Sequence, residues 1–415
     1  MRVAVVGAGS IGLAVAWRAA QDGAEVVVHD PEPGSGASRV AAGMIAPVTE
    51  SHYGEADLAP FMAASADAWP EFARELEAAS GLPVGFRDTP TVVVGIEDGD
   101  RAEVERQTGL YRRTGRGVDV LPGRAVRRAE PLLSHRVRAG VLAAEDRAVD
   151  PRAVHEALLA AAEHAGVRFE PTAVDDLAGL DADQVVIAAG CGSARFGLPV
   201  RPVRGVVLRL RAARDQEVPR TTVRGYVKGH SVYIVTRENG EVVVGATSDE
   251  RGDRTTGTAG AVHDLLRRSI ELVPEIAEYH LAEVSVGFRP GTPDNLPLIG
   301  RLDDRTVAAT GHYRNGIALI PATAAAVAAI LGGAAPNTLT AFDPARFPRA
   351  GGARLEGRAE PREAPFPSTP GTRVPDGSDS AGFPGGAQPR AAADAAAPEP
   401  RTPGGTGAGT HKEES

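Results

Sequence analysis

The stretch Val3-Ala4-Val5-Val6-Gly7-Ala8-Gly9-Ser10-Ile11-Gly12 decides the fold of this 415-residue chain. A short apolar run ends at Gly7, and glycines follow with the spacing G-x-G-x-x-G before a helical pattern begins. In a strand–turn–helix unit, Gly7 allows the tight turn, Gly9 lets the backbone approach a pyrophosphate, and Gly12 lets the helix pack closely on the strand. The N–H groups at the helix N-terminus would also attract that anion. The stretch therefore predicts a dinucleotide-binding β-α-β unit.

The residues that follow complete this unit. The helical pattern runs to Asp22, and a second apolar run from Glu25 to His29 leads to Asp30. An acidic residue at this place binds a ribose hydroxyl, and its charge opposes a 2′-phosphate, so NADP is not expected. The small-residue stretch from Gly34 to Met44 suits backbone that lies against an extended ligand, as FAD would need. A flexible loop would have the same composition, so this stretch alone does not decide between NAD and FAD.

Strand and helix patterns alternate at both ends of the chain, whereas strands dominate the middle. At the two ends the patterns predict a helix at 150–165, strands at 167–169, 184–188 and 306–309, and an Ala-rich helix at 317–331. In the middle they predict strands at 206–210, 232–236 and 242–246 and a helix at 262–273. Asn239-Gly240, between two of these strands, is a strong hairpin signal. One discontinuous α/β domain interrupted by a mainly antiparallel domain explains this order.

The domain limits follow from these patterns. The α/β domain is expected to comprise residues 1–80, 146–200 and 287–345, and the inserted domain residues 81–145 and 201–286. Residues 350–415 consist mainly of Gly, Pro, Ala and charged residues, with few large apolar side chains. Such a segment cannot bury enough surface to offset the entropy lost on ordering. We therefore expect it to be a disordered tail.

Composition and charge exclude several kinds of function. The net charge of −9 provides no basic field for a polyanion, so nucleic acid is not an expected partner. The run Val3–Ala20 behind Arg2 could pass for a signal peptide, but its glycine spacing favours a structural role, and no other long apolar run predicts a membrane span. Cys191 is the single cysteine, which rules out an intramolecular disulfide and fits a reducing cytoplasm. The sequence shows no metal-ligand cluster, so no metal site is expected.

Two late segments each place one arginine among glycines. Gly287–Asp294 contains Arg289, and Gly311–Gly316 contains Arg314 just before the last predicted helix. Glycine and proline clusters usually mark turns, and surface arginines are usually only solvated. Arginine is nevertheless the side chain best suited to bidentate carboxylate binding, and the glycines let backbone come close to a ligand. The positive end of the last helix could also stabilise negative charge on a reduced flavin ring.

Six segments together resemble a known family, and they occur in its order: Gly7–Gly12, Ala41–Met44, Tyr233–Val235, Val243–Thr247, Gly287–Thr292 and Gly311–Gly316. They resemble the FAD-dependent glycine oxidases of thiamine biosynthesis, which belong to the D-amino-acid oxidase superfamily. The resemblance runs from about residue 1 to 345 and leaves out the tail. It implies a glutathione-reductase-like (Rossmann-type) FAD domain, an α/β fold, with an inserted, mainly antiparallel β substrate domain of the α+β class.

The resemblance also implies a reaction. Glycine would be oxidised to iminoglycine, and O2 would reoxidise non-covalently bound FAD with formation of hydrogen peroxide. The imine would hydrolyse to glyoxylate and ammonia or serve thiazole synthesis, which makes a thiazole synthase a candidate partner. Family precedent favours a homo-oligomer. No cysteine lies near Arg289 or Arg314 in the sequence, so the covalent flavin link of sarcosine oxidases is not expected.

Site residues follow by position. Arg289 would hold the substrate carboxylate with help from Tyr233, and Arg314 would lie at the same site. Asp30 would bind the adenosine ribose, with Val174 on the adenine side. The full set implied at the cofactor is Gly7, Gly9, Ser10, Ile11, Gly12, Asp30, Pro31, Ser38, Ala42, Gly43, Met44, Val174, Gly190, His312, Tyr313, Arg314, Asn315, Gly316, Ile317 and Ala318.

The chain departs from the family pattern at two places. The segment from Thr172 to Gln184 is shorter than usual, and Arg39 stands where a small hydroxyl residue is common. Three alternatives share the motifs: a D-amino-acid dehydrogenase that passes electrons to another acceptor, an oxidase for sarcosine, D-alanine or D-proline, and a flavin-binding protein without turnover. The paired arginines argue against the last, since an anion is needed to justify their placement.

Overall fold

A computed structural model describes residues 1–250, 254–334 and 336–348, all of which fall in one compact unit. The predicted tail at 350–415 lies outside the described residues. Among the residues that are described, no helix is both long and apolar enough to cross a membrane.

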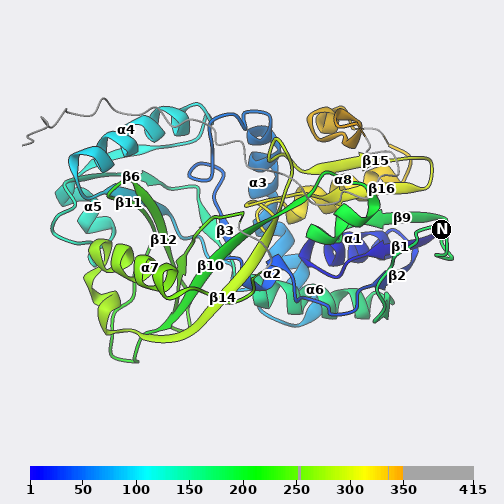
Figure 1. Cartoon of the computed structure of the whole chain (residues 1–415), viewed down its shortest axis with the longest axis horizontal. Helices are drawn as coiled ribbons and strands as arrows, with labels where there is room; N and C mark the ends of the chain where they lie inside the picture. Colours follow the sequence, from blue (N-terminus) through cyan, green and yellow to red (C-terminus); the bar gives the residue numbers. More distant parts are fainter. Residues whose placement is uncertain (251–253, 335, 349–415) are drawn as a thin grey trace, which may run out of the picture. The chain divides into compact units, whose positions relative to one another are not determined.

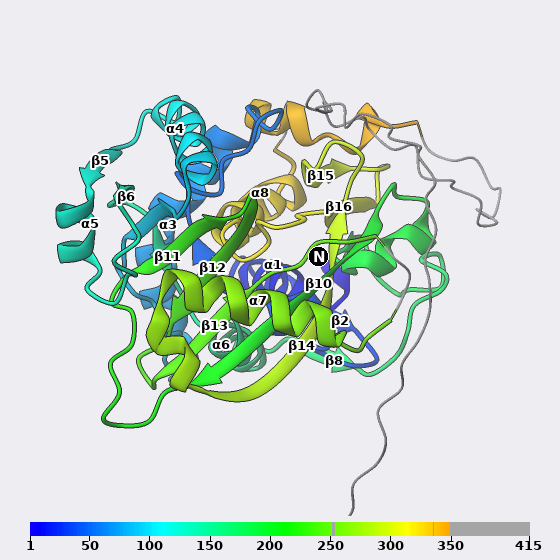
Figure 2. The same ribbon diagram turned by 60° about the vertical axis from the view of Figure 1, so that its left-hand side comes forward.

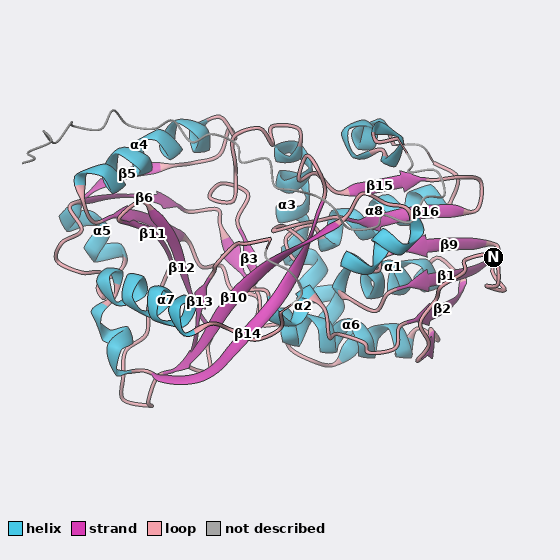
Figure 3. Cartoon of the chain, viewed as in Figure 1, coloured by secondary structure: helices cyan, strands magenta, loops and turns pink. Residues whose placement is uncertain are grey.

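A six-stranded sheet contains the N-terminal motif (Figures 1 and 3). Its strands, in spatial order, are β15 (Leu298–Arg301), β16 (Thr306–Thr310), β9 (Gln184–Ile187), β1 (Arg2–Val6), β2 (Glu25–His29) and β8 (Arg168–Glu170). All neighbouring strands are parallel except β15, which runs antiparallel to β16. Val3–Ala20 thus belongs to β1 and the helix after it, as the nucleotide interpretation predicts.

The glycines of the motif shape the junction between β1 and helix α1 (Ser10–Gln21). Gly7 has a φ of 111°, which side chains rarely adopt, and a Cβ there would press on the backbone of Ala188 in the neighbouring segment. A Cβ at Gly12 would collide with the carbonyl oxygen of Gly7. Gly12 therefore provides the close helix–strand contact that the sequence predicts.

Helices α1 and α8 (Ile320–Leu331) pack against this sheet, and α6 (Pro151–His164) and α3 (Leu58–Ser80) pack against these helices and against each other. Trp17 of α1 and Trp69 of α3 are fully buried and both contact the ring of Phe72 edge-on, at centroid distances of 5.7 and 5.4 Å. Aromatic rings prefer this geometry, and their burial supplies much of the core between the helices. Helix α8 begins three residues later than predicted, because Ile317–Leu319 form a turn that leads into Ile320 and Pro321.

An eight-stranded sheet forms the other half of the unit. Its spatial order is β14 (His280–Gly291), β10 (Arg201–Arg211), β13 (Glu241–Gly245), β12 (His230–Thr236), β11 (Thr222–Val227), β4 (Thr91–Gly95), β6 (Ala139–Ala143) and β5 (Asp119–Pro122). Neighbours are antiparallel except the parallel pair β11 and β4. Helix α7 (Ala259–Leu272) crosses one face of this sheet (Figure 2). The predicted fold class, a Rossmann-type α/β part with a mainly antiparallel part, is confirmed.

The remaining elements are α2 (Ala37–Val40), β3 (Met44–Ile45), α4 (Asp98–Arg112), α5 (Gly123–Ala129) and β7 (Arg147–Ala148), with short 3-10 turns at Gly190–Phe196, Pro274–Glu278, Asn337–Phe342 and Pro344–Arg346. Among them, β3 and β7 form a separate two-stranded sheet, and α4 packs on strands β4, β11 and β6. The hairpin at Asn239-Gly240 joins β12 and β13 as predicted, with Gly240 at a φ of 79°. Strand β14 continues past residue 287, where the sequence places the domain limit, and the limits themselves stay a proposal.

The structure corrects the predicted loop around Arg289. Residues 287–291 belong to strand β14, in which Arg289 pairs with Val203 and Pro290 with Pro202 of β10. Strand β14 lies at the edge of its sheet, where a proline without an N–H is tolerated. The glycine–proline pattern that suggested a turn is therefore the signature of an edge strand.

Candidate active site

A cavity of about 730 Å³ joins the two sheets. At one end it lies outside the carboxyl ends of β1, β2, β9 and β16, with Val6, His29, Ala188 and Thr310 in its wall. Open α/β sheets bind their ligands at this edge. At the other end the wall is formed by one face of the eight-stranded sheet, including Tyr233.

Most of the site residues proposed from the sequence line this cavity. They are Gly7, Gly9, Ser10, Ile11, Asp30, Pro31, Ser38, Ala42, Met44, Val174, Gly190, Tyr233, Arg289, His312, Tyr313, Arg314, Gly316 and Ile317. Four others lie behind the wall: Gly12, Gly43, Asn315 and Ala318. Two of these four support the wall, because Gly43 accommodates the carbonyl of Val149 where a Cβ would collide, and the carbonyl of Ala318 accepts hydrogen bonds from α3.

The nucleotide end is organised by one carboxylate and one hydroxyl. The Asp30 carboxylate accepts the backbone N–H of Ala8 at 2.7 Å and that of Glu32 at 2.8 Å. These bonds fix the loop after β1 to the end of β2 and leave carboxylate lone pairs for further donors. The Ser38 hydroxyl accepts the N–H of Ser10 at 3.1 Å, which ties the small-residue stretch to the start of α1.

The donors present at this end fit a pyrophosphate. Among the described residues, the buried Ser10 hydroxyl has no hydrogen-bond partner, although it stands in the first turn of α1. A Cβ at Gly9 would have only the Ser38 hydroxyl nearby, at 3.7 Å, so the space beside this backbone is open. Buried hydroxyls are normally paired, so an orphaned one at a helix N-terminus points to an anionic ligand. The residues therefore fit the cofactor that the motif predicts.

The loop after β16 forms the middle of the wall. His312 is buried and bonds Thr323 of α8 through Nε2 at 3.0 Å, and burial lowers the pKa of its imidazole to about 3. The imidazole is therefore neutral at physiological pH. Tyr313 has a φ of 48°, and its N–H donates to the carbonyl of Pro290 at 3.0 Å. This bond attaches the loop to the end of β14, so the two arginine segments of the sequence do meet.

The substrate end is a row of residues directly opposite one another on adjacent strands. Arg224 of β11 pairs with Tyr233 of β12, Tyr233 with Gly245 of β13, and Gly245 with Val207 of β10. Directly opposite residues point to the same face of a sheet, and all four line the cavity. The Tyr233 ring lies over Gly245, where a Cβ would collide with the phenol oxygen. Gly245 thus lets the Tyr233 hydroxyl lean toward β10.

Arg289 approaches the same place from β14. Its guanidinium lies over Gly205 of β10, where an added Cβ would be 2.5 Å from Nη1, and Nη1 donates to the Thr247 carbonyl at 3.2 Å. Burial raises the pKa of the Tyr233 hydroxyl, and the nearby charge of Arg289 acts in the opposite direction. Within the described part of the chain, no carboxylate forms an ion pair with Arg289. Its charge is available for an anion in the cavity.

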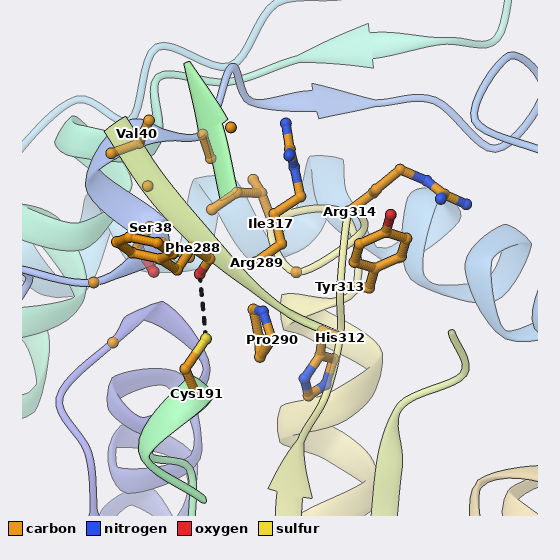
Figure 4. Close-up of a pocket in the computed structure, with 18 of the residues that line it drawn as sticks. Ser38, Val40, Cys191, Phe288, Arg289, Pro290, His312, Tyr313, Arg314 and Ile317 are labelled. Atoms are coloured by element: carbon orange, nitrogen blue, oxygen red, sulfur yellow. Dashed lines mark hydrogen bonds between the residues drawn. The ribbon is translucent and has the colours of Figure 1, made fainter. Parts of the chain in front are cut away.

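Arg314 has a different environment. Figure 4 shows that its side chain and that of Arg289 extend in different directions from different elements. The Arg314 guanidinium pairs with Glu55 through contacts of 2.6 and 2.9 Å and lies 4.4 Å from the Tyr313 ring centroid. Arg314 lines the cavity, but its charge is balanced by Glu55. Its predicted role as a second carboxylate ligand stays a prediction.

The cavity-lining residues that the sequence did not single out include three titratable side chains that lie close together: Glu50, His52 and Arg224. Arg224 forms an ion pair with Glu50. Burial, followed by the charge of Arg314, lowers the pKa of His52 to about 4, so its imidazole is neutral. An arginine inside an otherwise apolar strand was the available signal, since such a charge needs a partner when the strand is buried. Its partner Glu50 lies far away in the sequence and could not be identified there.

Cys191 also reaches the cavity. Its thiol donates to the carbonyl of Phe288 at 3.5 Å, as Figure 4 shows, so a cysteine does lie beside the residue that precedes Arg289. The sequence separation had suggested otherwise. Burial raises the pKa of this thiol to about 11, which keeps it protonated and unreactive.

Comparison with known proteins identifies relatives along most of the chain. The chain is 32% identical over 349 residues to the Bifunctional protein ThiO/ThiG of Nostoc sp., a match that covers 79% of this chain and 52% of that protein. It thus spans about half the length of the first relatives it matches. It is 32% identical over 369 residues to the Glycine oxidase of Geobacillus kaustophilus, with 83% of this chain and 95% of that protein covered.

Comparison with solved structures leads to the same group of proteins. The crystal structure of glycine oxidase from Geobacillus kaustophilus superimposes with a TM-score of 0.77 at 30% identity, and the match covers 83% of this chain and 99% of that one. The family model described as FAD dependent oxidoreductase matches residues 2–330. The cofactor and the family predicted from the motifs are confirmed. Because this family model matches most of the chain, the chain belongs to the DAO family of FAD-dependent oxidoreductases.

Proposed function

We propose that the protein oxidises the carbon–nitrogen bond of glycine, and of small related amines such as sarcosine or D-alanine, to the imine. The observation that carries this proposal is the Arg289 guanidinium, which faces the cavity beside Tyr233 without a carboxylate partner among the described residues. Relatives named glycine oxidase support the substrate. The imine would hydrolyse to glyoxylate and ammonia, and O2 would accept the electrons and become hydrogen peroxide.

The residues of the chain divide this task. The backbone from Gly7 to Gly12 would hold the pyrophosphate of FAD, Asp30 its ribose, and the loops at Ala42–Met44 and His312–Ile317 its flavin. FAD, when bound, supplies the acceptor for the two electrons and the hydrogen that leave the α-carbon. Arg289 would bind both oxygens of the substrate carboxylate, and the Tyr233 hydroxyl would donate a further hydrogen bond.

Charge balance favours a small monocarboxylate. Arg289 carries one positive charge that the described residues do not balance, whereas Arg224 and Arg314 are each paired with a glutamate. An amino acid that enters with a neutral amine brings one negative charge and matches it. With the carboxylate fixed, the α-carbon is oriented without a strong protein base, because the hydrogen leaves with its electrons.

The proposal extends to what happens to the imine. The first relatives are fusions named ThiO/ThiG, and the present chain matches about half of their length. We propose that the imine supplies thiazole formation in thiamine biosynthesis through a thiazole synthase as a separate partner. Coupled assays with and without such a synthase would measure whether the imine is captured before it hydrolyses.

The test of the reaction is spectroscopic. The purified protein should show a flavin spectrum, and glycine added without oxygen should bleach it. Admitting air should restore the colour with one peroxide per glycine consumed. A yellow protein that stays oxidised with glycine but is bleached by D-alanine or sarcosine would show that the substrate is one of those amines instead of glycine. Slow recovery of the colour in air would favour a dehydrogenase. A protein that is not bleached by any small amino acid would contradict the proposal.

A further inference from the structure

The far end of the cavity contains a buried ion pair whose role differs from that of Arg289. Arg224 pairs with Glu50, which lies between β3 and α3, and both residues line the cavity. We propose that this pair selects substrates by charge: the Glu50 carboxylate contacts Nη1 of Arg224 and balances its charge, so the far end admits uncharged substituents and rejects a second negative group. This inference rests on the proposed function, in which Arg289 binds the first carboxylate.

The strand register places the pair beside the proposed substrate. Arg224 lies directly opposite Tyr233, and the Arg289 guanidinium lies over β10, three strands from β11. Three strand spacings amount to about 14 Å, a span that two long side chains and a small ligand can bridge. The Tyr233 ring leans away toward Gly245. The row therefore continues from the carboxylate anchor to Arg224 along one face of the sheet.

The pair is ionised and still touches the cavity. Burial tends to raise the pKa of Glu50, but the nearby arginine charges, that of Arg224 first and that of Arg314 after it, act in the opposite direction, and the pKa lies below its ordinary value. The Arg224 side chain keeps 18% exposure and that of Glu50 keeps 9%. Because both residues line the cavity, this exposure is toward the ligand space. Two opposite charges are thus presented side by side and sum to zero.

Net charge then decides which ligands fit. Arg289 alone offers an uncompensated positive charge at this end among the described residues, and one carboxylate neutralises it. A second carboxylate beside Arg224 would also lie close to the Glu50 carboxylate, and like charges repel strongly in a partly buried site. Removing the Glu50 charge should turn Arg224 into a second anion site. Removing the Arg224 charge should turn Glu50 into a cation site.

Matched ligands that cannot be oxidised test this without turnover. Methoxyacetate is the ether analogue of N-methylglycine, diglycolate adds a second carboxylate, and (2-aminoethoxy)acetate adds an ammonium group. Their dissociation constants can be measured on the oxidised FAD-bound protein from the change in its visible spectrum. In the wild type, methoxyacetate should bind more tightly than either ligand that has a second charged group.

Two variants invert this preference in opposite directions. Glu50→Gln should improve binding of diglycolate relative to methoxyacetate by about tenfold or more, the size of one charge-assisted contact. Arg224→Gln should do the same for (2-aminoethoxy)acetate. The double variant Glu50→Gln/Arg224→Gln is the control and should favour neither. Each single variant decides on its own, so the test survives if one of them fails to fold.

An unchanged preference in a folded single variant would overturn the inference, as would equal gains in the double variant. These outcomes are distinct from failure of the proposed function. If glycine is not oxidised, the proposed reaction is wrong, but the dissociation constants of the three ligands still show whether the ion pair selects ligands by charge. If glycine is oxidised but ligand charge makes no difference in either variant, only the charge selection is wrong.

Discussion

Nη2 of Arg314 lies 2.6 and 2.9 Å from the two carboxylate oxygens of Glu55, whose side chain is only 7% exposed. This pair ties the loop after β16 to the segment before α3. Arg314→Ala would leave a buried carboxylate without its cation, and we expect the free energy of unfolding to fall by about 3 kcal/mol. Urea denaturation of the FAD-bound protein measures it. The double variant Arg314→Met/Glu55→Gln should recover most of the loss, and an equal loss in both would show that the pair is not the cause.

Arg289→Ala tests the carboxylate anchor. We expect the KM for glycine to rise about 100-fold or more, because a bidentate charged contact is lost, while the visible flavin spectrum stays unchanged. The KM of Arg289→Lys should lie between those of the wild type and the alanine variant, since lysine keeps the positive charge but cannot bind the carboxylate with two parallel hydrogen bonds. Oxygen consumption at varied glycine concentration provides the KM. If it is unchanged in the alanine variant, another group holds the carboxylate.

Gly245→Ala tests the position of Tyr233. A Cβ at Gly245 would collide with the phenol oxygen of Tyr233, so the ring must turn away from its place over β13. We expect a rise of about fivefold in the KM for glycine, which corresponds to the loss of one hydrogen bond of about 1 kcal/mol. Gly260→Ala is the matched control, because nothing lies within 4 Å of a Cβ there. Tyr233→Phe should show the same effect, and the two changes combined should not add.

The sequence predicted those parts of the molecule whose signals are local. The spacing of Gly7, Gly9 and Gly12 reflects contacts within one strand–turn–helix unit, and the hairpin at Asn239-Gly240 reflects a turn that few other residues can form. These elements are where the sequence placed them. The end of the edge strand β14 was mistaken for a loop, because Pro290 is tolerated there only for lack of a second neighbouring strand, which depends on the whole sheet.

The ion pairs could not be predicted for the same reason. Arg314 meets Glu55 only when the loop after β16 reaches the segment before α3, and Arg224 meets Glu50 only when strand β11 does so. Residue type suggested that an arginine of this site binds a carboxylate, which is correct chemistry. It could not show that for two of the arginines the carboxylate belongs to the protein itself. That difference leaves Arg289 as the proposed anchor.

Ser10→Ala tests the orphaned hydroxyl at the start of α1. If the Ser10 hydroxyl donates to the pyrophosphate of FAD, its loss should weaken FAD binding about five- to tenfold, the effect of about 1 kcal/mol. The apoprotein should become slightly more stable, because a buried hydroxyl without a partner is removed. Titration of the apoprotein with FAD and thermal denaturation without FAD measure the two effects. A loss of stability in the apoprotein would mean that the hydroxyl has a partner within the protein.

His312→Asn tests how burial of one imidazole sets the response to acid. The pKa of His312 is lowered by burial to about 3, whereas in the unfolded chain it is near the ordinary 6.5, so the unfolded state binds the proton first as pH falls. The contribution of His312 to the free energy of unfolding is therefore fully present above about pH 6.5. It is lost as the pH falls toward 3, by up to about 1.4 kcal/mol per pH unit. Asparagine does not titrate, so the variant lacks this contribution. Between about pH 6 and 4.5, the free energy of unfolding of the variant should therefore fall less steeply than that of the wild type, by up to about 1.4 kcal/mol per pH unit.

Urea denaturation at constant excess FAD measures these slopes. His52→Asn is the matched comparison, because the pKa of His52 is lowered to about 4, first by burial, and its contribution has the same sign over a narrower range. Below about pH 4 its contribution should level off, while that of His312 continues. If the wild type and His312→Asn lose stability at the same rate from pH 6 to 4.5, then His312 is protonated in the folded protein. The neutral imidazole bonded to Thr323 would then be the wrong description of this wall of the cavity.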